Sequence, residues 1–180
     1  PFADITTHTT GYVSRINQND VKKLEAEGKI DNYEGSTEIG KLGIEKYYED
    51  YLHGVTGSSK VEVNSHGQVV RTLNFVPPEP GKDITLTLDI RLQYYAQEIF
   101  GKMKGAVVAI EPSTGEILAM YSNPSYDPNP FVRGIRGGEY QRLLNNPGHP
   151  LINRATQGGY APASTVKPLM CLMGLNEGLI

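Results

Sequence analysis

The stretch Tyr160-Ala161-Pro162-Ala163-Ser164-Thr165-Val166-Lys167-Pro168 is a short segment with two prolines, and the apolar run of residues 169–173 follows it. This change of pattern predicts a helix that begins near Ala163. Residues three apart lie on the same face of a helix, so the Lys167 ammonium would lie within reach of the Ser164 hydroxyl. A serine hydroxyl becomes a good nucleophile when an adjacent base takes its proton. The spacing therefore predicts Ser164 as a nucleophile that becomes acylated and Lys167 as its general base.

The Ser-x-x-Lys spacing alone is weak evidence. The chain holds nine serines and ten lysines in 180 residues, so about 0.5 such pairs are expected by chance, which is the usual risk with short motifs. On spacing alone, a helix-capping serine followed by a surface lysine is the better interpretation. The remainder of the chain has to decide between the two.

Composition indicates an ordinary globular protein of one domain or two small ones, with 38% hydrophobic and 21% charged residues. A net charge of −3 without a basic run argues against nucleic-acid binding. The single cysteine, Cys171, excludes an internal disulfide, and we expect it to be a buried small hydrophobic residue. The four histidines lack metal-ligand spacing, and we expect no metal and no cofactor. No transmembrane stretch or signal peptide is visible, and we expect the chain to be a piece of a longer protein.

Residues 1–81 read as a small mixed module. The patterns predict a strand over residues 9–16, a helix over 20–27, a second helix over 36–52, and a hairpin of 60–63 with 68–73 in which Gly67 supplies a positive φ. Three prolines and a glycine in residues 76–81 interrupt regular structure. We place the division between two modules near residue 81.

Residues 82–180 read as an antiparallel sheet with helices. The patterns predict a strand over 83–88, a helix over 90–104 capped by Asp89, and paired strands over 105–110 and 117–121, the first of them buried on both faces or nearly so. Residues 122–154 are rich in Pro, Asn and Gly and show little regular pattern. The fold class predicted for the whole chain is α+β.

Several longer motifs occur in one order along the chain. They are residues 39–54, the strand-like segment 83–89, the hairpin 106–119, the segments 124–129 and 153–158, and then Ser164 with Lys167-Pro168. In this order the chain resembles the class B penicillin-binding proteins, which are peptidoglycan transpeptidases, and especially the cell-elongation subtype of Gram-negative rods. The family commonly has Pro-Pro-Gly before the serine, where this chain has Ala161-Pro162-Ala163.

The resemblance implies a pedestal module over residues 1–81 and the first part of a transpeptidase domain over 82–180. It implies that Ser164 attacks the D-Ala-D-Ala amide of a stem peptide, that Lys167 is the general base, and that penicillins and other β-lactam antibiotics acylate the same serine. It also implies a place on the periplasmic face of the inner membrane. Residues 1–81 would bind a membrane glycosyltransferase and scaffold proteins of the elongation complex.

Two further motifs of the family, Ser-x-Asn and Lys-Thr-Gly, are not found in suitable positions in these residues. We therefore expect the transpeptidase domain to be incomplete and the 180-residue chain to be inactive alone. Two alternatives stay open. A serine β-lactamase or a β-lactam sensor shares Ser-x-x-Lys, and a non-catalytic scaffold module of the elongation complex would use residues 1–81.

Overall fold

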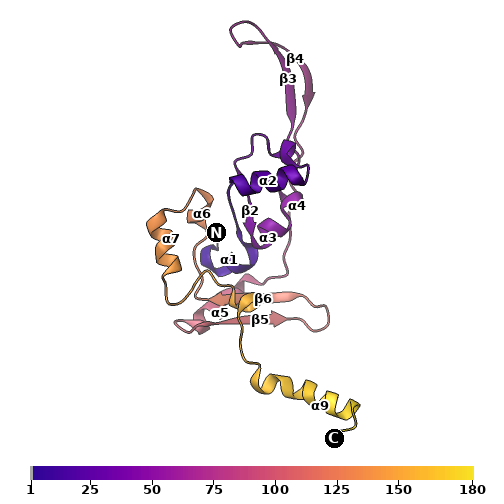
Figure 1. The fold of residues 1–180 in the computed structure, drawn as a ribbon, viewed down its shortest axis with the longest axis vertical. Helices are drawn as coiled ribbons and strands as arrows, with labels where there is room; N and C mark the ends of the chain where they lie inside the picture. Colours follow the sequence, from indigo (N-terminus) through magenta and orange to yellow (C-terminus); the bar gives the residue numbers. More distant parts are fainter. Residues whose placement is uncertain (1) are drawn as a thin grey trace.

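A computed structural model describes residues 2–180, and the chain in it is elongated (Figure 1). A long hairpin lies at one end, a small module of helices and strands follows, a second module with one sheet comes next, and a single helix lies at the other end. The arrangement is α+β, as the sequence predicts.

The first module is built around a two-stranded antiparallel sheet in which β1 pairs with β2, with Arg15 opposite Glu38. Helix α2 begins with a capping box, because Asn17 accepts from the N–H groups of Asn19 and Asp20 and the Asp20 carboxylate accepts from the Asn17 N–H. The elements are α1 (Ala3–Thr10), β1 (Tyr12–Arg15), α2 (Gln18–Ala26), the 3-10 helix η1 (Ile30–Tyr33), β2 (Glu38–Leu42), α3 (Gly43–Tyr47) and α4 (Glu49–Leu52).

Two expectations for this module are corrected. The predicted strand over residues 9–16 begins only at Tyr12, and residues 3–10 are helical. The predicted helix over 36–52 begins instead with strand β2, because its backbone pairs with β1. Glycines at positions 40 and 43 make this stretch a poor helix, so the pairing outweighs the helical spacing of its apolar residues.

The hairpin is confirmed, with strands β3 (Ser58–Val63) and β4 (Val69–Val76) and Gly67 at φ +75°. The first strand is two residues longer at its start than the pattern predicts, and the second runs three residues further, into the proline-rich segment. Both strands are exposed along their whole length, and Figure 1 shows the hairpin projecting from the first module.

The second module combines helix α5 (Ile90–Phe100) with the antiparallel pair β5 (Gly105–Ile110) and β6 (Ile117–Asn123). Asp89 caps α5 as predicted, and its carboxylate accepts from the Arg91 N–H at 2.8 Å. The helix ends at Phe100 because Gly101 turns the chain at φ +46°.

Three further expectations for the second module are wrong. Residues 83–88 form no strand: the Thr87 hydroxyl donates to the Ile117 carbonyl of β6, and the backbone bond to β6 comes from the Asp89 N–H, just after the segment. Strand β5 is exposed or half-buried in this chain rather than buried on both faces. The stretch 122–154 contains the short helices α6 (Asn129–Val132) and α7 (Gly137–Leu144), and α8 (Arg154–Gln157) begins at its end.

The best-buried part of the chain lies where α1 meets α5, β6 and the segment after β6. Figure 1 shows α1 beside the second module, although it comes from the start of the chain. The contact is partly apolar and partly polar, because Thr7 and Gln93 are both 0% exposed. The buried apolar side chains of this region are Ile5, Ala96, Ala119, Tyr121, Tyr126 and Phe131.

Candidate active site

Ser164 and Lys167 lie at the junction of two helical segments. Ser164 is the second residue of the 3-10 helix η2 (Ala163–Val166), and Lys167 is the first residue of α9 (Lys167–Asn176). Side chains at i and i+3 eclipse in a 3-10 helix, so this geometry puts the two residues on one side of the segment. The Lys167 N–H donates to the Ser164 carbonyl, which joins η2 to α9 without a break. Pro168 falls in the first turn of α9, where its missing N–H costs no helical hydrogen bond.

The residue before the serine has an unusual backbone conformation. Ala163 has φ +46°, in the left-handed region that glycine adopts freely. For an L-residue with a Cβ this conformation costs about 1–2 kcal/mol. The Thr165 N–H and hydroxyl both donate to the Pro162 carbonyl and close the turn that contains Ala163. The departure from the family's glycine therefore falls at a position that requires a positive φ.

Both candidate side chains are exposed, and in the part of the chain that the structure describes no hydrogen bond joins Ser164 Oγ to Lys167 Nζ. Apolar side chains cover all sides of α9, and Leu169, Leu172 and Met173 are each about 60% exposed. Cys171 is also exposed, so the expectation that it is buried is wrong for this chain. A helix that is apolar all round is typical of the inside of a larger domain. None of the helices in residues 2–180 has the length and apolar character needed to cross a membrane.

Helix α8 is the element that precedes the serine segment. The Asn153 side chain caps this helix by accepting from the Ala155 N–H at 3.1 Å. Five residues, 158–162, connect α8 to η2. The chain is tightly folded at Gly158, where a Cβ would lie 2.6 Å from the Arg154 carbonyl oxygen and 2.5 Å from the Tyr160 ring. The sequence motifs predict no role for Asn153, although an asparagine before a short polar helix is a recognisable capping signal.

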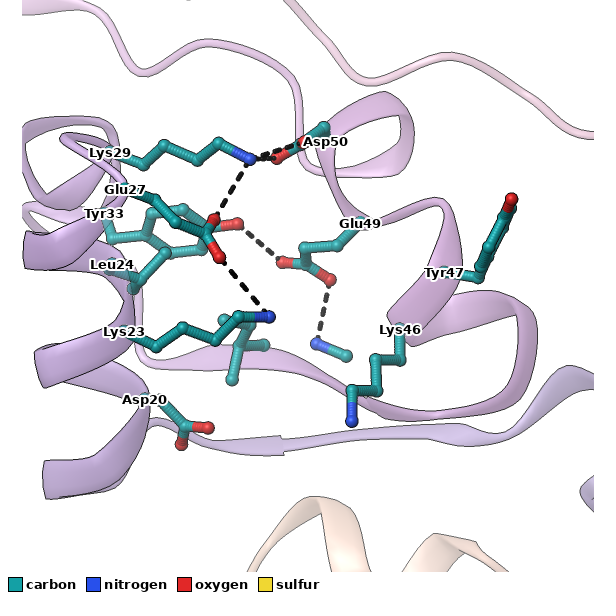
Figure 2. A pocket seen from close by; sticks show the side chains of 12 residues that line it. Asp20, Lys23, Leu24, Glu27, Lys29, Tyr33, Lys46, Tyr47, Glu49 and Asp50 are labelled. Carbon is teal, nitrogen blue, oxygen red and sulfur yellow. Dashed lines mark hydrogen bonds and ion pairs between the residues drawn. The ribbon is translucent and has the colours of Figure 1, made fainter.

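A separate hollow of about 350 Å³ lies in the first module and contains neither candidate residue. Figure 2 shows Glu49 at its centre, where the carboxylate accepts from the Tyr33 hydroxyl at 3.0 Å and from the Gly40 N–H at 2.8 Å. Burial, and then the Glu49 carboxylate, raise the pKa of the Tyr33 phenol. Lys29 bridges Asp50 and Glu27 at the rim. The hollow is lined by paired charges, and no sequence motif predicted it.

Two family models match the chain over separate ranges. The Penicillin-binding Protein dimerisation domain matches residues 1–86, and the Penicillin binding protein transpeptidase domain matches residues 105–180. Peptidoglycan D,D-transpeptidase MrdA of Escherichia coli K12 is 53% identical to this chain over all 180 residues. The chain belongs to the penicillin-binding proteins.

The relatives are much longer than this penicillin-binding protein chain, which spans 28% of the Escherichia coli protein. Penicillin-binding protein 3 of Bacillus subtilis is 38% identical over 183 aligned residues, which cover 100% of this chain and 26% of that protein.

Solved structures agree with this family. The structure of Pseudomonas aeruginosa PBP2 in complex with WCK 5153 is 44% identical, with a TM-score of 0.84 over 100% of this chain and 35% of that one. A Helicobacter pylori complex between PBP2 and MreC is 34% identical, with a TM-score of 0.89 over 98% of this chain and 32% of that one. The class B, PBP2-like resemblance seen in the sequence is confirmed.

Proposed function

We propose that this chain is part of a peptidoglycan D,D-transpeptidase that cross-links stem peptides during cell elongation. The main support is the position of Ser164 and Lys167, which lie one helical turn apart at the η2–α9 junction. Both residues fall within the range that the transpeptidase family model matches. The order of motifs before the serine and the likeness to D,D-transpeptidases over the whole chain support the same reaction.

The reaction proceeds in two acyl transfers. Ser164 Oγ attacks the carbonyl carbon of the penultimate D-alanine, the amide bond to the terminal D-alanine breaks, and the freed amine takes a proton as D-alanine leaves. An amine of a neighbouring stem peptide then attacks the ester, forms the new amide and returns the proton to Ser164. Lys167 takes the serine proton as the general base and returns it to the leaving amine. The Ser164 N–H lies in the first turn of η2 and supplies one donor for the oxyanion.

A fluorescent penicillin tests this function in a full-length protein that contains the chain. The parent protein should form a covalent adduct, Ser164→Ala should abolish labelling, and Lys167→Ala should slow it by at least a hundredfold. Labelling that persists in Ser164→Ala would show that another residue is the nucleophile. The 180-residue chain alone should remain unlabelled, since it lacks the family's other two active-site motifs.

The lifetime of the label separates a transpeptidase from a β-lactamase, and a stem-peptide cross-linking assay separates it from a β-lactam sensor. A transpeptidase should hold the penicilloyl ester for many minutes, because an amine rather than water is its natural acceptor. A β-lactamase would release the product within seconds and turn over many equivalents of penicillin. A β-lactam sensor would keep the ester but would not cross-link stem peptides.

We also propose that the division between modules lies near residue 81 and that residues 1–81 bind scaffold proteins of the elongation machinery and a membrane glycosyltransferase. The ranges of the two family models, which end at 86 and begin at 105, support the division. The Helicobacter pylori complex with MreC supports a scaffold partner, and Tyr47, 82% exposed at the edge of the hollow in Figure 2, gives this module an aromatic contact surface. The catalytic part would lie on the periplasmic face of the inner membrane.

A variant of the full-length protein tests the scaffold role. Tyr47→Asp should lower capture of an MreC-type partner at least tenfold and leave penicillin labelling at the parental rate. Loss of labelling together with capture would show that the substitution unfolds the protein. Unchanged capture would place the partner surface elsewhere on the molecule.

A further inference from the structure

Helix α1 belongs to the start of the chain but is fixed to the second module by buried polar contacts. The Thr7 hydroxyl donates to the Tyr126 carbonyl at 2.9 Å, and Gln93 Nε2 donates to the Ile5 carbonyl at 3.0 Å. The other end of the Gln93 amide accepts from the Met120 N–H at 2.7 Å. Buried polar groups need their partners, so these bonds specify one position of α1 on β6. The position of helix α1 on the second module is therefore fixed, and a segment that binds α1 is held in place with it.

Asn153 attaches the serine segment to helix α1. Its Nδ2 donates at 3.0 Å to the carbonyl oxygen of His8, which is one of the last four carbonyls of α1 and has no partner within the helix. Its Oδ1 caps α8 by accepting from the Ala155 N–H. One amide thus binds both the end of α1 and the start of α8, although His8 and Asn153 are 145 residues apart in the chain.

Ser122 holds the residues on either side of Asn153. Its hydroxyl donates to the Ile152 carbonyl at 3.2 Å and accepts from the Arg154 N–H at 3.0 Å, and the side chain is 1% exposed. The Arg154 guanidinium donates to the carbonyls of His149 and Gly148. The chain is therefore fixed on β6 and α1 at the start of α8, eleven residues before Ser164.

We propose that Asn153 is a positioning residue for Ser164, because it ties the start of the serine segment to α1. The chain is tightly folded at Gly158, so the position of α8 also restricts the path of residues 158–162. Helix η2 begins directly after these residues. The proposal rests on the proposed function, in which Ser164 is the nucleophile. Small displacements of a reacting group lower rates strongly, with about a hundredfold loss for 1 Å. Release of this tie should therefore slow acylation and leave the non-covalent binding of penicillin almost unchanged.

In a full-length protein, Asn153→Asp separates the capping of α8 from the hydrogen bond to α1. Aspartate keeps the oxygen that caps α8 but cannot donate to the His8 carbonyl. Acylation by a fluorescent penicillin, measured over a range of concentrations, gives the acylation rate constant and the dissociation constant separately. Asn153→Asp should lower the rate constant at least tenfold and change the dissociation constant less than threefold. Asn153→Ala should show the same loss with a lower thermal midpoint.

Asn17 offers a matched control, because it caps α2 in the same way and is remote in sequence from the serine segment. Asn17→Ala should lower the thermal midpoint and leave the acylation rate constant unchanged. Parental acylation by Asn153→Asp would overturn the proposal. So would an equal loss in Asn17→Ala, since the rate would then follow stability alone.

Amide hydrogen exchange tests the tie independently of catalysis. Residues 154–166 should exchange at least tenfold faster in Asn153→Asp than in the parent, while Asn17→Ala should leave them unchanged. Equal exchange in parent and Asn153→Asp would refute the tie even if acylation fell. If Ser164→Ala is still labelled, the proposed function is wrong. The exchange measurement would still show whether Asn153 holds residues 154–166 to α1.

Discussion

Helix α1 should lose stability in mild acid, because its His8 side chain is buried and burial disfavours the charged imidazolium. The side chain is 7% exposed and lies edge-on to the Tyr126 ring, with 5.5 Å between ring centroids. Within residues 2–180 neither ring nitrogen of His8 has a hydrogen-bond partner. The pKa of His8 is lowered from 6.5 to about 4, mainly by burial; the Pro150 carbonyl partly offsets this effect, and the nearby Arg154 charge adds a smaller lowering.

The size of the effect follows from the two pKa values. One pH unit corresponds to roughly 1.4 kcal/mol, so the difference between 6.5 and about 4 is worth roughly 3 kcal/mol in full. The unfolded state binds the proton more tightly than the folded state. The stability due to neutral His8 is therefore complete above about pH 6.5 and is lost as the pH falls toward 4. At pH 4.5 the loss should already reach roughly 2.5 kcal/mol.

His8→Leu isolates this contribution, because leucine has a similar volume, does not titrate, and leaves the His8 backbone carbonyl in place for Asn153. Amide exchange in the full-length protein gives the free energy of opening of α1 at pH 7 and at pH 4.5. From pH 7 to pH 4.5, this free energy should fall more in the parent than in His8→Leu. The difference between them should be about 2.5 kcal/mol.

His66→Leu is the control, since His66 lies exposed in the hairpin turn, and it should behave as the parent does. An unchanged pH dependence of α1 in His8→Leu would refute the reasoning.

Three further predictions follow from single contacts. Ala163→Gly should stabilise the serine turn by roughly 0.5 kcal/mol, since glycine avoids the cost of a positive φ but loses more entropy on folding; Ala163→Val should be less stable than either in thermal melts. Gln93→Leu should destabilise the protein by about 1–3 kcal/mol in denaturant titrations, because it leaves the Met120 N–H without its acceptor and removes the bond to the Ile5 carbonyl. Asp89→Ala should lower the thermal midpoint by removing the cap of α5, whereas Asp89→Asn should keep most of it.

Local patterns predicted the parts of the fold that local interactions determine. The hairpin β3–β4 follows from Gly67 and its flanking β-branched residues, and α5 follows from Asp89 and the apolar spacing after it. The junction of η2 and α9 follows in the same way from two prolines and an apolar run. In each case the signal and the structure lie within about fifteen residues of one another.

The errors occur where a distant segment decides the structure. Residues 38–42 have apolar spacing that suits a helix, but strand β1 supplies a partner for their backbone, and they form β2. Residues 3–10 show no strong helical pattern of their own. They form α1 because Thr7 and Gln93 find buried partners across the two modules. Pairings of this kind cannot be read from a single stretch of sequence, since neither partner indicates the other.

The candidate site shows both effects within one short segment. Ser164 and Lys167 could be proposed from spacing and motif order, because the nucleophile and its base lie one turn apart. Asn153 could not be assigned a role in the same way, since its capping bond is local but its bond to the His8 carbonyl joins segments 145 residues apart. A helix-capping asparagine looks the same in the sequence whether or not it also holds a second helix. Only the fold, which places α1 beside α8, reveals the second bond and with it a reason for an asparagine rather than an aspartate at this position.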